Sequence, residues 1–63
     1  MEYVVEKRIF YRLPCDQYGQ PNGQIESWKI TEAEYNIEKN YEEQNHLAIW
    51  FDNYESAIAR ADN

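Results

Sequence analysis

Residues 28–44, WKITEAEYNIEKNYEEQ, contain the passage from a strand into a helix that organises the rest of the chain. Thr31 and Glu34 match a capping box, in which the Thr31 hydroxyl accepts from the Glu34 amide while the Glu34 carboxylate accepts from the Thr31 amide. Ile30 and Tyr35 occupy the two positions of a hydrophobic staple around this cap. A helix is therefore expected to begin directly after Thr31 and to fray just beyond the quoted stretch.

Before this cap, the sequence predicts two paired strands. Residues 3–13 alternate as a half-buried strand does, with one face made of Tyr3, Val5, Ile9, Tyr11 and Leu13. Residues 14–23 contain both prolines and both glycines of the chain, so they form a loop. Asn22-Gly23 is a favoured turn dipeptide, and a second strand over about 24–30 is expected to pair back as a long-looped hairpin.

After the cap, the pattern predicts the rest of the first helix, one strand and a second helix. Ala33, Ile37 and Tyr41 recur every four residues, as a narrow stripe facing the core would. Residues 47–51, LAIWF, form a short apolar run typical of a buried strand. Asp52 is a good N-cap with Glu55 three positions on. The apolar face of the helix that follows contains Tyr54, Ala57, Ile58 and Ala61.

The resulting order of elements is ββαβα, which predicts an α+β fold with two helices packed on one face of a three-stranded sheet. A chain of 63 residues is long enough for one such domain, spanning residues 1–63. If the first helix connects parallel neighbouring strands, the connection should cross over in the right-handed sense.

Composition predicts an intracellular protein with a basic partner. Twelve acidic residues against six basic ones give a net charge of −6, so direct binding to nucleic acid is not expected. A protein with a basic surface is the natural partner. The sequence has no signal peptide and no apolar run that could cross a membrane, and the single cysteine, Cys15, suits a reducing cytoplasm.

Catalytic chemistry is not expected. The only nucleophile sets combine His46 with Cys15, Ser27 or Ser56, and none is surrounded by a recognisable motif. Cys15 and His46 alone are too few ligands for a structural zinc site, and no glycine-rich phosphate loop is present. The sequence therefore predicts a protein that is not an enzyme and needs no cofactor or metal, with a cysteine and histidine enzyme or metal carrier as a distant third choice.

The charge is concentrated in the second half of the chain, because residues 31–63 contain eight acidic and two basic residues. Glu34, Glu38 and Glu42 follow at intervals of four, which stacks three carboxylates along one flank of the helix at a small cost in helix stability. We therefore expect an anionic face that is used for protein binding. Its predicted residues are Glu32, Glu34, Tyr35, Glu38, Glu42 and Glu43, continued by Asp52 and Glu55.

In size and charge the whole chain resembles small phage-encoded inhibitors that imitate DNA, such as anti-CRISPR proteins, anti-restriction proteins and uracil-DNA glycosylase inhibitors. The resemblance implies a protein that blocks a nucleic-acid-handling enzyme in the host cytoplasm. It involves no shared motif, so no residue roles are carried over. The alternative is a structural or regulatory interaction module, for example a homodimer that pairs through a strand edge or an aromatic patch around Trp50 or Tyr54.

Overall fold

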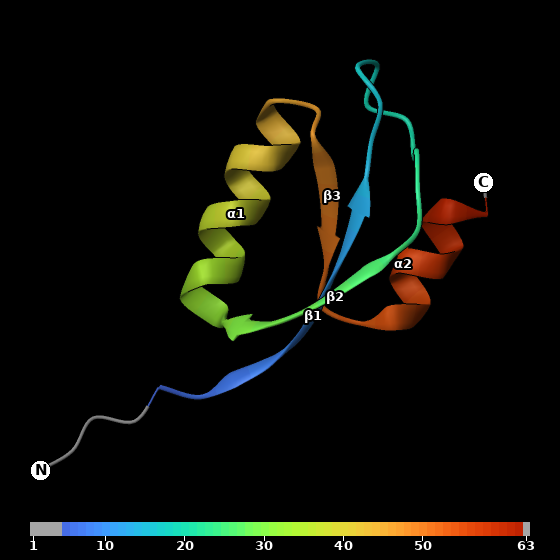
Figure 1. Ribbon diagram of the computed structural model, residues 1–63. Coiled ribbons are helices and arrows are strands. Elements are labelled where there is room, and N and C mark those ends of the chain that lie inside the picture. Colours follow the sequence, from blue (N-terminus) through green and yellow to red (C-terminus); the bar gives the residue numbers. More distant parts are fainter. Residues whose placement is uncertain (1–4, 63) are drawn as a thin grey trace, which may run out of the picture.

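The computed structural model describes residues 5–62 and contains three strands and two helices in this part of the chain (Figure 1). In chain order they are β1 (Lys7–Pro14), β2 (Glu26–Thr31), α1 (Glu32–Gln44), β3 (Ala48–Phe51) and α2 (Tyr54–Ala61). The strands form one antiparallel sheet in the order β2-β1-β3. The predicted α+β class and the ββαβα order are both confirmed. Tyr3, which was assigned to the first strand, lies outside the described residues.

The first of the three described strands, β1, occupies the middle of the sheet. Residues 7–12 of β1 pair with β2, and residues 11–14 pair with β3. Because both partners run antiparallel to β1, β2 and β3 run parallel to each other with β1 between them. The connection through α1 therefore joins parallel strands that are not neighbours. The right-handed crossover was predicted only for neighbouring parallel strands, so that condition is not met. Within residues 5–62, no helix is long and apolar enough to cross a bilayer.

The loop between β1 and β2 turns at residues 16–20 instead of at the predicted Asn22-Gly23. The Asp16 carboxylate accepts hydrogen bonds from the amides of Tyr18 and Gln20, at 2.9 and 3.0 Å. Gly19 adopts φ +77°, a conformation that glycine reaches without strain. The Asp16 side chain thus replaces the missing strand partners at the tip of the loop.

Both helices begin at polar caps. At α1 the capping box is present in full, since Thr31 Oγ1 accepts from the Glu34 amide at 3.1 Å and Glu34 Oε1 accepts from the Thr31 amide at 3.3 Å. At α2 the N-cap is Asn53, whose side chain accepts from the Ser56 amide at 2.8 Å. The sequence therefore placed the first cap correctly and the second one residue too early.

The two helices lie on opposite faces of the sheet, which corrects the prediction that both pack on one face (Figure 1). Phe10 stacks on Tyr35 of α1 with ring centroids 4.1 Å apart, whereas the ring of Tyr11 lies 5.3 Å from that of Tyr54 in α2. Successive strand residues point to opposite faces, so these contacts place α1 and α2 on different sides. The reason is that β1 is apolar on both faces: Phe10 and the oppositely directed Leu13 are both fully buried.

The α1 helix is also rotated relative to its predicted orientation. Ile37 and Tyr41, from the stripe expected to face the core, are 66% and 59% exposed. The side of α1 that meets the sheet contains Tyr35 and the buried Glu42 instead. The apolar periodicity gave the wrong face because the inner side of this helix contains a carboxylate that satisfies buried donors of the sheet.

Candidate protein-binding face between α1 and β2

An ion pair between the half-buried Arg12 and the buried Glu42 holds α1 on the sheet. Arg12 Nε and Nη2 donate to the two carboxylate oxygens of Glu42, both at 2.8 Å, and Trp50 Nε1 donates to Glu42 Oε1 at 2.5 Å. The hydrogen bonds from Arg12 and, to a lesser extent, from Trp50 lower the pKa of Glu42, although burial opposes this shift. The hydrogen bonds between Arg12 and Glu42 also raise the pKa of Arg12. Glu42 therefore remains ionised inside the protein at neutral pH.

Strand register brings the partners of this pair together. Arg12 of β1 lies opposite Glu26 of β2 on one side and opposite Trp50 of β3 on the other, so the three residues form a row across the sheet. Arg12 Nη1 also donates to the Glu26 carboxylate, at 3.2 and 3.3 Å. All three side chains point to the face covered by α1. The guanidinium is thus shared between one buried carboxylate and one half-exposed carboxylate.

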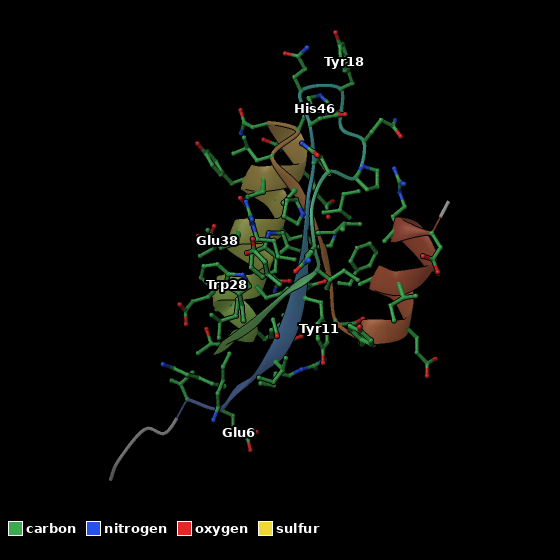
Figure 2. The ribbon with its side chains drawn as sticks, turned by 45° about the vertical axis from the view of Figure 1, so that its right-hand side comes forward. Glu6, Tyr11, Tyr18, Trp28, Glu38 and His46 are labelled. Carbon is green, nitrogen blue, oxygen red and sulfur yellow. The ribbon has the colours of Figure 1, made fainter. Side chains whose placement is uncertain are left out.

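Above this row lies an open groove of about 560 Å³ between α1 and β2, which we call the α1–β2 groove. Its lining consists of Arg12, Glu26, Trp28, Ile30, Glu34, Glu38, Glu42 and Trp50. Trp28 is 45% exposed, and its ring centroid lies 6.0 Å from that of the buried Trp50. Figure 2 shows Glu38 and Trp28 on the same side of the molecule, from α1 and β2 respectively.

The helix adds apolar groups next to the two exposed carboxylates of the groove. Glu34, Ile37, Glu38 and Tyr41 are spaced at i, i+3, i+4 and i+7, so their side chains are neighbours on one flank of α1. Ile37 and Tyr41 are among the most exposed large apolar side chains of the described chain. Together with Trp28, these four residues form the surface that we call the groove face. It combines two acidic residues with two aromatic residues and one aliphatic residue.

Several predicted site residues lie elsewhere. Glu42 is buried and ion-paired, so the prediction that it contributes to an exposed row of carboxylates is wrong. Glu43 pairs with Lys39 at 3.1 Å, and its other oxygen accepts from the Trp50 amide at 3.3 Å. Tyr35 packs in the core against Phe10. The predicted row of three carboxylates is therefore reduced to two, because the third provides the acceptor that the sheet needs.

The remaining acidic residues do not extend the groove face. Glu32 is two positions from Glu34, so it points to the opposite side of α1. Glu55 belongs to α2 and lies on the other face of the sheet. Asp52 is close enough to Tyr35 for its charge to add to the effect of burial, which raises the pKa of that phenol. The predicted acidic residues thus form separate groups around the molecule.

Cys15 and His46 lie together at the far end of the sheet, around a cavity of about 250 Å³ that also involves Gly19. Burial raises the pKa of the Cys15 thiol, which disfavours the reactive thiolate. The exposed His46 lies in the loop between α1 and β3 with φ +56°, next to the β1–β2 loop (Figure 2). Within residues 5–62, no group of three histidine, cysteine or acidic residues is arranged to hold a metal ion.

The residues that sequence reasoning did not include in the site are Arg12, Glu26 and Trp28, together with Ile37 and Tyr41, which were expected to face the core. A signal for them existed, because Glu26 and Trp28 are two apart in a predicted strand and must share a face. The pairing of Arg12 with Glu42 had no such signal, since it joins residues thirty positions apart.

Comparison with protein-family models, with curated proteins and with solved structures found no match.

Proposed function

We propose that this protein binds a nucleic-acid-handling protein through the groove face and blocks its nucleic-acid site. The observation that carries the proposal is the juxtaposition of Glu34 and Glu38 with exposed Trp28 and Tyr41. Arg12 is the single cation in the groove lining, and it is already paired with two carboxylates. The face is therefore anionic, and it offers the aromatic side chains that are enriched in interface hot spots.

Two carboxylates one helical turn apart are separated by about 6 Å along the axis, a spacing of the same order as successive phosphates. A basic groove that follows a nucleic-acid backbone could accept Glu34 and Glu38 in place of two phosphates. The aromatic groups beside them would add apolar contacts. Inhibition would be competitive and non-enzymatic. We place it in the cytoplasm, of the host cell if the protein is phage-encoded, where a lone thiol such as Cys15 stays reduced.

The structure changes how this proposal is tested. Reversing the charge of Glu42 would place a second cation against Arg12 at a buried position and destabilise the fold, and a lysine at Glu34 would remove half of the capping box. The informative variant is therefore E34Q/E38K, because glutamine retains the cap. A matched control is E32K/E55Q, which changes the net charge equally, since each variant combines one reversal with one neutralisation.

In the experiment, immobilised protein captures partners from a nuclease-treated lysate of the source cells, and the captured protein is then tested for nucleic-acid binding. Wild type and E32K/E55Q should capture the same protein and abolish its binding to DNA or RNA, whereas E34Q/E38K should not. Capture should weaken with added salt, since exposed charges are screened beyond about 10 Å at 0.1 M. Equal capture by both variants, or a captured protein that still binds nucleic acid normally, would refute the proposal.

The second candidate function is a homo-oligomeric interaction module, which the exposure of Ile37 and Tyr41 favours. Such a module would associate through this apolar pair and would tolerate the loss of charge at Glu38. Sedimentation at increasing concentration distinguishes the two functions. Self-association that is lost in I37S/Y41S but kept in E38K supports the module. Trp50, which was expected to belong to an aromatic patch of such a module, is unsuitable for this test because it is buried and donates a hydrogen bond to Glu42.

A further inference from the structure

The α1–β2 groove has an unequal distribution of hydrogen-bonding groups. Its N–H donors are directed at the carboxylates of its floor: Trp28 Nε1 donates to Glu26 Oε1 at 2.9 Å, and Trp50 Nε1 donates to Glu42. Arg12 donates to both of these carboxylates. The donors of the two indoles are thereby used within the protein. A ligand entering the groove meets the exposed indole of Trp28, because Trp50 is buried, and finds no free indole N–H.

The carboxylate acceptors that α1 contributes to the groove, in contrast, are not all occupied by hydrogen bonds within the described chain. Glu34 uses Oε1 for its bonds to Thr31, and no bond within residues 5–62 involves its second oxygen. Glu38 has no hydrogen-bond or ion-pair partner in the same part of the chain and is exposed. With four carboxylates and one guanidinium, the lining has a formal charge of −3. The groove therefore suits a ligand that is cationic and rich in donors.

The walls of the groove favour a flat cation. The indole planes of Trp28 and Trp50 are inclined at 56°, and Trp28 is held in place by its bond to Glu26 while remaining 45% exposed. A cation over an indole face is attracted by the ring quadrupole. Guanidinium is planar, stacks on aromatic faces and carries five N–H donors, whereas an ammonium is compact and strongly hydrated.

We propose that the α1–β2 groove binds the guanidinium group of an arginine side chain, stacked on Trp28 and hydrogen-bonded to Glu38 and Glu34. That the arginine belongs to a protein partner rests on the function proposed above, because nucleic-acid sites are rich in arginine. The groove itself recognises the side chain through its own acceptors and indoles. An anionic ligand would instead meet a surface of like charge.

The test uses the two indole N–H signals of the protein in NMR spectra, because the chain contains two tryptophans. A blocked Gly-Arg-Gly peptide is titrated at low ionic strength in parallel with Gly-citrulline-Gly and Gly-Lys-Gly. The arginine peptide should shift the Trp28 signal saturably. Citrulline has nearly the same shape but no charge, and it should bind at least about fivefold more weakly. Lysine should also bind more weakly than arginine.

Variants assign the effect to the groove. E38Q should weaken the arginine peptide about threefold and W28L, followed through the remaining Trp50 signal, about fivefold, while E32Q, on the other side of α1, should leave its binding unchanged. Equal binding of citrulline or lysine, an absence of saturable shifts, or equal effects of E32Q and E38Q would overturn the inference. A peptide that fails to bind while E34Q/E38K still loses its protein partner would overturn the arginine site alone and leave the proposed function standing.

Discussion

The buried pair of Arg12 and Glu42 leads to a quantitative prediction for the variant E42Q. The substitution keeps the shape of the side chain and an oxygen for Trp50, but it removes the charge that receives two bonds of 2.8 Å from Arg12. Hydrogen bonds to charged groups contribute about 1.5–3 kcal/mol, and breaking a buried ion pair costs about 3–5 kcal/mol. Because Arg12 is partly exposed and keeps Glu26 as a partner, we expect a loss of about 2–3 kcal/mol.

That loss is large for a domain of this size, since a core of fewer than about 70 residues rarely supplies more than 3–5 kcal/mol. Urea unfolding followed by tryptophan fluorescence measures it directly. With a slope of about 1 kcal/mol/M, the midpoint should fall by about 2–3 M. The matched control is E38Q, the same substitution on the same helix at an exposed position, which should change stability by less than about 0.5 kcal/mol.

The effect should also depend on pH in a defined direction. The pKa of Glu42 is lower in the folded than in the unfolded protein, so its contribution is fully present above the unfolded value of about 4.3. It is lost as the pH falls through the folded pKa. The stability gap between wild type and E42Q should therefore be constant from pH 7 to pH 5 and should shrink below about pH 4. An E42Q variant as stable as E38Q, or a gap that does not shrink in acid, would refute this account of the pair.

Three further predictions concern local structure. T31A should lose about 1 kcal/mol of stability in urea unfolding, because it removes the N-cap of α1, and T31S should restore most of it; equal losses in both variants would contradict the capping role. G19A should also lose about 1 kcal/mol, because φ is +77° and the new Cβ would lie 3.0 Å from His46 Nδ1, and H46A should not rescue it in full. The raised pKa of Cys15 predicts that iodoacetamide reacts more slowly with folded than with urea-unfolded protein at pH 8. In the folded protein, the plot of alkylation rate against pH should have its midpoint at a higher pH than that of a free thiol. A folded midpoint at or below that of a free thiol would show that the site is exposed or activated.

Much of the fold could be predicted because its determinants are local. The capping box at Thr31 is contained in four residues, and the apolar run that became β3 is interrupted by no polar residue. The element order followed directly from such signals. The placement of the helices did not, because it depends on which face of β1 each helix covers. Phe10 and Leu13 point in opposite directions, so each face offered a buried position and the alternation alone could not choose between them.

The candidate site was predicted in part for the same reason. Glu34 and Glu38 are neighbours by helical geometry, and the structure keeps them together at the groove. Glu42 belongs to the same series by spacing, but it is withdrawn from the surface by Arg12, a residue of a distant strand. Spacing describes where side chains lie around one helix. Which face of the helix turns toward the sheet is set by the groups on the surface against which the helix packs. The orientation of α1 was therefore decided by Arg12 and Trp50.

The position of β1 has a consequence for how the chain reaches its native state. This strand precedes β2 and β3 in the sequence but lies between them in the sheet. During synthesis, β1 can pair with β2 early, whereas its second edge remains open until β3 has also been synthesised. An open central edge is a template for pairing with another chain. The same topology that encloses β1 in the finished protein thus leaves the nascent chain exposed to strand exchange between copies until β3 is available to pair.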